Sequence, residues 1–186
     1  MEQKLPRLVI AGTNSGCGKT TVTCAVLQAL VNRGLSVAAA KCGPDYIDPM
    51  FHSRIIGAKS ANVDPFFFDE PTLRYLLAQN AAGCAVTIIE GVMGYYDGLG
   101  LTTTRASTWE TAQKTASPTI LVVNARGAAL SVLAAGGAAL RLPDAEAGPD
   151  RCSFPPGRRG AAAFPAIPGG PAFAARCGWP AARRRA

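Results

Sequence analysis

The chain has 186 residues, of which 48% are hydrophobic, and this predicts one globular domain with a buried core rather than a fibrous or disordered protein. Its formal net charge of +7 is unevenly spread: residues 1–135 hold eleven Lys or Arg and nine Asp or Glu, whereas residues 136–186 hold eight Arg and three acids. We therefore expect no nucleic-acid partner. The charged amino terminus with its short apolar run predicts neither a secretory signal nor a membrane span, so we expect a cytoplasmic protein with no membrane contact.

Residues 7–11, RLVIA, form an apolar run that predicts a buried strand, and a glycine-rich segment follows directly. Apolar residues then recur at helical spacing up to Gly34, which predicts a helix that begins at about Lys19. Strand, glycine-rich loop and helix in this order are typical of a phosphate-binding loop.

Three further apolar runs predict buried strands, at residues 35–41, 86–90 and 118–124. Residues 69–80 predict a helix between the first two of these, with Asp69 as its amino-terminal cap. Strands that alternate with helices predict an α/β fold built on a parallel sheet.

The segment IAGTNSGCGKTT departs slightly from the pattern G-x-x-x-x-G-K-[ST], because Gly12 lies one place early. Gly16 and Gly18 still allow a tight turn whose backbone N–H groups point at phosphates, and Lys19 can reach the outer phosphates. Thr20 offers a hydroxyl to Mg²⁺. A turn that only happens to read this way is the alternative.

The acidic candidates also follow predicted strands, where ligands of parallel sheets bind. Glu90 ends the run TIIE and suits a carboxylate that anchors a metal. Asp45 and Asp48 lie in a segment broken by Pro44 and Pro49, which predicts a loop. Their carboxylates either bind cations and orient substrate or form turns, and spacing alone does not decide between the two.

Residues 136–186 are about three-quarters Ala, Gly, Pro and Arg and contain no Val, Thr, Asn or Lys. Such a composition cannot form a packed core, so we expect a disordered, low-complexity tail after a domain of residues 1–135. Our hypothesis is that a shift of reading frame in GC-rich DNA generated the tail. A basic tail for RNA or membranes and a genuine linker are the alternatives.

Four segments together resemble one family: AGTNSGCGKTT at 11–21, KCGPDYIDPMFH at 41–52, NVD at 62–64 and EGVMGYYDG at 90–98. They are similar to the amino-terminal ATP-binding half of cobyrinic acid a,c-diamide synthases, which are glutamine-dependent enzymes of corrin-ring assembly in cobalamin biosynthesis. The resemblance runs from about residue 7 to 134. It implies a P-loop NTPase of the dethiobiotin-synthetase-like type, with ATP and Mg²⁺ as cofactors and corrin carboxylates as acceptors.

The resemblance also assigns site residues. Those it implies in catalysis are Lys19, Asp45, Asp48, Glu90 and Asp97, with Asp97 at the substrate carboxylates. Those it implies at the metal are Thr20, Asp45 and Glu90. The nucleotide is expected to contact Gly12, Thr13, Asn14, Ser15, Gly16, Cys17, Gly18, Lys19, Thr20, Thr21 and Lys41.

Four residues with ring side chains each have two interpretations. His52 also matches the family pattern, and a surface histidine is an equally weighted alternative. Phe66 to Phe68 are expected to pack in the protein rather than to contact the macrocycle.

The sequence departs from the family after residue 135, where a continued sheet and a glutaminase domain are expected, so we expect the sheet to be incomplete at its carboxyl end. Glutamine or free ammonia would supply nitrogen, and a homodimer is left open for the full-length family. Four alternatives remain: a partition-type ATPase, a GTP switch, the related adenosylcobyric acid synthase, and an inactive fragment that at most binds nucleotide.

Overall fold

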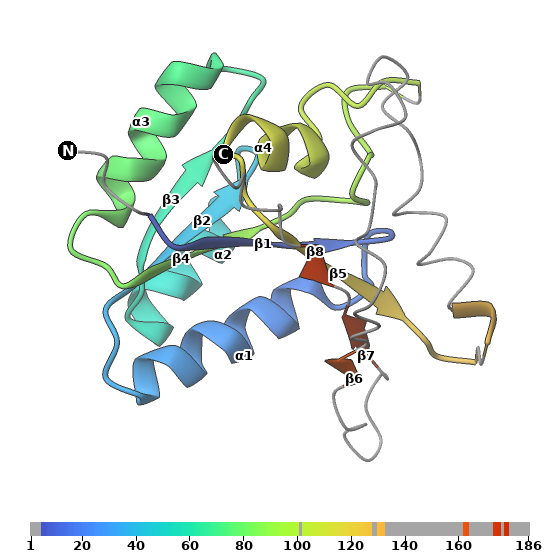
Figure 1. The fold of residues 1–186 in the computed structure, drawn as a ribbon, viewed down its shortest axis with the longest axis horizontal. Coiled ribbons are helices and arrows are strands. Elements are labelled where there is room, and N and C mark those ends of the chain that lie inside the picture. Colours follow the sequence, from blue (N-terminus) through green and yellow to red (C-terminus); the bar gives the residue numbers. More distant parts are fainter. Residues whose placement is uncertain are drawn as a thin grey trace, which may run out of the picture.

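A parallel sheet forms the centre of the protein in the computed structural model, which describes residues 5–100, 102–127, 130–132, 162–163, 173–175 and 177–178. Its parallel strands lie in the order β3-β2-β4-β1-β5, with parallel pairing at every step. The strands are β1 (Arg7–Gly12), β2 (Val37–Cys42), β3 (Lys59–Val63), β4 (Val86–Glu90) and β5 (Thr119–Asn124). The predicted α/β fold with a parallel sheet is confirmed (Figure 1).

Helices cover both faces of this sheet (Figure 1). One face packs against α3 (Glu70–Ala81) and α4 (Thr108–Lys114), whose Leu77 and Ala112 join the apolar cluster around Ile89. The other face packs against α1 (Lys19–Asn32) through Leu27, and against the π-helical segment η1 (His52–Ile56) through Ile56. The short helix α2 (Ile47–Phe51) leads directly into η1.

Sequence patterns missed β3, α2 and α4. The edge strand β3 reads KSANV, of which only Val63 is buried, so it lacks the apolar run that marks a buried strand. Asp48 lies in the first turn of α2, and so the prediction that both Asp45 and Asp48 lie on a loop is wrong for Asp48. Pro49 does not break this helix, because a proline is tolerated in a first turn, where the backbone N–H needs no helical partner.

Short strands from the tail pair with β5. These are β6 (Ala162–Ala163), β7 (Phe173–Ala175) and β8 (Cys177–Gly178); β7 and β8 run antiparallel to β5, and β6 pairs with β7. The predicted disorder of residues 136–186 and the domain boundary at 135 concern mainly residues outside the described ranges, so both stay predictions. In the described part of the chain, no helix has the length and apolar character needed to cross a membrane.

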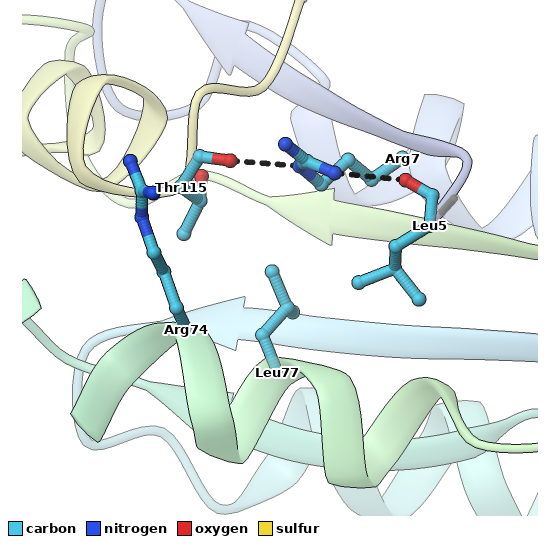
Figure 2. Close-up of a pocket in the computed structure, with 5 residues that line it drawn as sticks. All are labelled: Leu5, Arg7, Arg74, Leu77 and Thr115. Carbon is cyan, nitrogen blue, oxygen red and sulfur yellow. Dashed lines mark hydrogen bonds between the residues drawn. The ribbon is translucent and has the colours of Figure 1, made fainter. Parts of the chain in front are cut away.

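A small cavity of about 130 Å³ lies where β1 begins, and two arginines border it (Figure 2). The Arg7 guanidinium donates to the backbone carbonyls of Leu5, Thr115 and Ala116, and Arg74 Nε donates to the Lys114 carbonyl. These carbonyls lie mostly at the end of α4, where helix carbonyls lack intrahelical partners. The two arginines therefore anchor the carboxyl end of α4 and have a structural role.

The amino-terminal end of α4 is held by reciprocal capping. Ser107 Oγ accepts from the Glu110 backbone N–H at 3.1 Å, and the Glu110 carboxylate accepts from the Ala106 backbone N–H. We predict that Ser107→Ala costs about 1 kcal/mol of folding free energy, because the cap acceptor is lost. Chemical denaturation measures the loss. Ser53→Ala is the control, since that exposed hydroxyl only donates to carbonyls of the preceding turn, and an equal loss in both variants would contradict the cap.

Candidate functional site

The glycine-rich loop joins the end of β1 to the start of α1, as predicted. Gly16 and Gly18 have φ angles of 74° and 102°, a left-handed conformation that L side chains rarely adopt. Gly12 ends β1 against buried Cys17, and a Cβ at Gly12 would collide with the Cys17 sulfur and lie 2.9 Å from Lys19 Cγ. The early glycine is thus required by close packing inside the loop.

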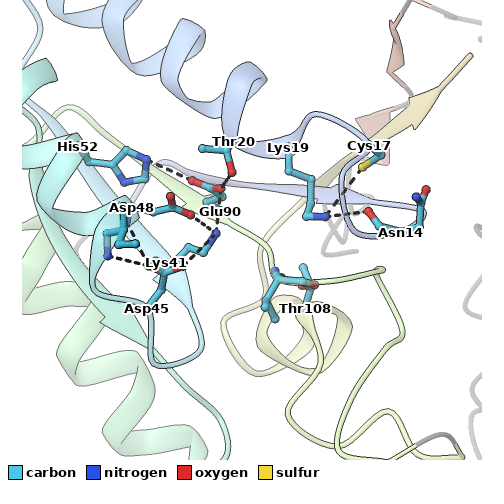
Figure 3. Close-up of polar contacts among 12 residues, drawn as sticks. Asn14, Cys17, Lys19, Thr20, Lys41, Asp45, Asp48, His52, Glu90 and Thr108 are labelled. Carbon is cyan, nitrogen blue, oxygen red and sulfur yellow. Dashed lines mark hydrogen bonds and ion pairs between the residues drawn. The ribbon is translucent and has the colours of Figure 1, made fainter. Parts of the chain in front are cut away.

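Lys19 is the first residue of α1, directly after this loop, and 8% of its surface is exposed. Its Nζ donates to the Asn14 carbonyl at 2.9 Å and lies 3.9 Å from Cys17 Sγ (Figure 3). A hollow of about 260 Å³ beside it is lined by Gly16, Gly18, Lys19, Thr20 and Thr21. A cation and the positive end of α1 border this hollow, so it is suited to an anion.

The Glu90 carboxylate is fully buried at the end of β4. Its Oε1 accepts from Thr20 Oγ1 at 2.5 Å and from Lys41 Nζ at 2.9 Å, and its Oε2 lies 3.2 Å from His52 Nε2 (Figure 3). Burial acts to raise the pKa of Glu90, but the contacts with His52, Lys41 and Thr20 outweigh it and lower the pKa to about 2. Glu90 is therefore ionised at neutral pH.

Lys41 connects this carboxylate to the acids that follow β2. Its Nζ lies 2.5 Å from Asp48 Oδ2 as well as 2.9 Å from Glu90 Oε1. Burial acts to lower the pKa of Lys41, but Glu90 and Asp48 together raise it above its ordinary value. The ammonium is thus a buried cation that compensates the clustered acids.

Asp45 has a different environment from the one predicted for a metal ligand. Its Oδ1 accepts from the backbone N–H groups of Ile47 and Asp48, and its Oδ2 lies 4.0 Å from Lys41 Nζ. Asp45 therefore forms the turn that starts α2, whereas Asp48 forms an ion pair. The structure brings Thr20, Lys41, Asp48 and Glu90 together and holds Asp45 at the rim of this group.

The loop after β4 carries Asp97 and lies against the phosphate loop. The Tyr95 backbone N–H donates to the Gly12 carbonyl at 2.7 Å, and Asp97 Oδ2 accepts from the Gly94 N–H at 2.8 Å. A Cβ at Gly94 would lie 2.9 Å from the Thr13 carbonyl oxygen, so only glycine allows this approach. Asp97 therefore braces its own loop beside the phosphate loop.

Two other expectations change. His52 is fully buried, so it is not a surface histidine. Phe66, Phe67 and Phe68 are 46%, 63% and 38% exposed, and the expectation that they pack inside the protein is wrong. The sequence FFF follows β3 and sits on the surface in a turn where the Phe66 N–H donates to Asp64, with Arg105 over the Phe66 ring at 5.8 Å.

The oxygen atoms present fit Mg²⁺ in part. Mg²⁺ usually keeps several waters and takes one or two protein oxygens together with phosphate oxygens. Thr20 Oγ1 and Glu90 Oε1, in direct contact, provide such a pair. Within the described residues no cluster of three or more His, Cys, Asp or Glu side chains is placed to hold a metal, and Asp45 contacts neither Thr20 nor Glu90 in a hydrogen bond or ion pair.

Comparison with known proteins shows the family of the chain. The profile of the CobQ/CobB/MinD/ParA nucleotide binding domain matches residues 8–137. The chain belongs to this family. The resemblance to cobyrinic acid a,c-diamide synthases is confirmed by relatives of that name: cobyrinate a,c-diamide synthase of Thermoplasma volcanium is 49% identical over 124 residues, which cover 67% of this chain and 27% of the relative.

Other relatives give the same result. Cobyrinate a,c-diamide synthase of Salmonella typhimurium is 41% identical over 68% of this chain and 28% of the relative. Hydrogenobyrinate a,c-diamide synthase of Streptomyces coelicolor is 42% identical over 70% of this chain and 27% of the relative. The chain thus spans less than a third of the length of the curated relatives it matches. Membership of the family supports nucleotide binding by this domain.

The packing of Gly12 on Cys17 can be tested by a double-mutant cycle. We predict that Gly12→Ala destabilises the chain by about 1–3 kcal/mol, the usual cost of overpacking. Cys17→Ala removes the sulfur that the new methyl group meets, so the cost of Gly12→Ala should be smaller in that background. Denaturation of the four proteins measures both costs, and equal costs in the two backgrounds would show that the sulfur is not the obstacle.

Proposed function

We propose that this chain is the ATP-binding part of an amidoligase that converts the a- and c-carboxylates of cobyrinic or hydrogenobyrinic acid to amides in cobalamin biosynthesis. The observation that carries the proposal is the joining of the phosphate loop to the buried Thr20–Glu90–Lys41 group at the carboxyl edge of the sheet. Relatives with up to 49% identity are named as synthases for this reaction. The substrates and a cytoplasmic location belong to the same proposal.

The phosphate loop would bind the phosphates of ATP. Lys19 lies beside the hollow, and in the proposal its Nζ leaves the Asn14 carbonyl to contact the outer phosphates. Thr20 and Glu90 would hold Mg²⁺, which when bound neutralises charge on the phosphates. Asp45 joins them only if its turn opens, because one of its oxygens accepts two backbone N–H groups.

The acceptor in this reaction is already an anionic nucleophile, so no general base is required. A carboxylate oxygen of the corrin attacks the γ-phosphorus, the bond to the β-phosphate oxygen breaks, and ADP leaves. Ammonia then attacks the acyl carbon, phosphate leaves, and the nitrogen loses a proton. Positioning and charge neutralisation by Lys19 would supply much of the catalysis, because the main obstacle is repulsion between two anions.

Asp97 and Asp48 would act on the substrate side. Asp97 lies on the loop that touches the phosphate loop, and Asp48 holds Lys41, so both are close to the edge where the acceptor must enter. Nucleotide binding without amidation is the second candidate, because the chain covers only part of its relatives. The partition-type ATPase is less favoured, since the relatives matched at 41–49% identity over more than 120 residues are named synthases.

Lys19→Ala should weaken ATP binding by about tenfold to a hundredfold, because a charge-assisted contact contributes roughly 1.5–3 kcal/mol. Titration with a fluorescent ATP analogue measures this. Lys59→Ala is the matched control, since Lys59 donates to the Gln79 carbonyl at the edge strand. Equal affinity in K19A and K59A would remove Lys19 from the phosphate site.

The nitrogen donor can be tested on the 186-residue chain. The only histidine of the sequence, His52, faces Glu90, so it does not serve a glutaminase cysteine. We therefore expect any amidation of cobyrinic acid with MgATP to occur with ammonium and not with glutamine. Mass spectrometry of the corrin products distinguishes the two. Diamide formation from glutamine, with contaminating amidotransferases excluded, would contradict this expectation, and no product with either donor would favour nucleotide binding alone.

A further inference from the structure

His52 is a buried polar side chain that the mechanism above does not use. Its imidazole is fully buried at the start of η1, and Figure 3 shows the ring facing Glu90 from the side away from Lys19. The π-helical segment holds the backbone of His52 in place, because the His52 carbonyl accepts from the backbone N–H groups of Gly57 and Ala58. π-Helical turns are frequent at functional sites.

The two oxygens of Glu90 have separate partners. Oε1 accepts from Thr20 and Lys41, whereas Oε2 has no aligned hydrogen bond in the described structure and faces only His52 Nε2, at 3.2 Å. Both ring nitrogens of His52, Nδ1 and Nε2, are likewise buried without an aligned hydrogen bond among the described residues. A buried carboxylate oxygen left without a donor is costly, so the tautomer with the proton on Nε2 is favoured.

This division matters because the carboxylate of a glutamate rotates easily about its terminal torsion. Contact of Oε2 with the rigid imidazole limits that rotation and keeps Oε1 beside Thr20. Partners behind a metal ligand commonly change metal affinity about 10–100-fold when they are removed.

We propose that His52 is a positioning residue of the nucleotide-metal site, whose Nε2–H holds Glu90 Oε2 so that Oε1 and Thr20 face the Mg²⁺ of MgATP together. The inference rests on the proposed role of Thr20 and Glu90 in holding that metal. It assigns His52 no contact with nucleotide or corrin. A histidine that only fills the core is the competing explanation.

Two amide variants separate these explanations. In His52→Gln the side-chain amide can reach the position of Nε2, whereas in His52→Asn it is one methylene shorter and falls short of Oε2. The full chain and each variant are titrated with a fluorescent ATP analogue, once with excess Mg²⁺ and once with EDTA. The ratio of the two affinities is the magnesium-dependent gain.

We expect H52N to lose about 10–100-fold of this gain, with its affinity in EDTA unchanged, and H52Q to keep most of the gain. A role in core packing alone would lower both affinities alike or leave the gain intact. The proposal is overturned if H52N keeps the gain of the parent chain, or if H52Q loses as much as H52N. If the parent chain binds the analogue but shows no gain, the metal role of Thr20 and Glu90 fails together with the proposal; if it binds no nucleotide at all, the proposed function fails as well.

Discussion

The carboxyl edge of the sheet depends on one buried negative charge, the Glu90 carboxylate at the end of β4. A carboxylate removed from water is stable only when donors and cations replace its hydration. Its partners Thr20, Lys41 and His52 come from α1, β2 and η1. The same contacts that keep Glu90 ionised therefore hold three elements in fixed positions around the phosphate loop.

This compensation is close but incomplete. Lys41 is shared between Glu90 and Asp48, and Asp45 lies 4.0 Å from the same ammonium. Three carboxylates therefore surround the single positive charge of Lys41. An excess of negative charge next to a loop built for phosphates would repel a nucleotide. A divalent cation that arrives with the phosphates removes this conflict, which is a physical reason for such a site to bind a metal complex of the nucleotide rather than the free anion.

Much of the fold could be predicted because β1, β2, β4 and β5 are apolar runs buried on both faces. The signal fails for the edge strand β3, whose residues KSANV are only partly buried, and for α4, whose seven residues carry no clear apolar period. The position of the site followed from the rule that ligands bind where parallel strands end. The side-chain contacts within the site could not be predicted. Glu90 contacts residues that lie 70 and 49 positions away in the sequence, and the spacing of residues along the chain does not indicate such contacts. His52 is the clearest example, since only the folded chain shows that it faces Glu90.

The two loops assigned to the proposed reaction are joined to each other by backbone contacts. The Tyr95 N–H holds the Gly12 carbonyl, Gly94 touches Thr13, and Thr108 Oγ1 both accepts from and donates to the backbone of Val92. The loop that carries Asp97 is thus fastened to the phosphate loop on one side and to α4 on the other. Transfer between two anions depends on their alignment more than on any acid or base, so in the proposed reaction a backbone that links the two loops would itself contribute to catalysis.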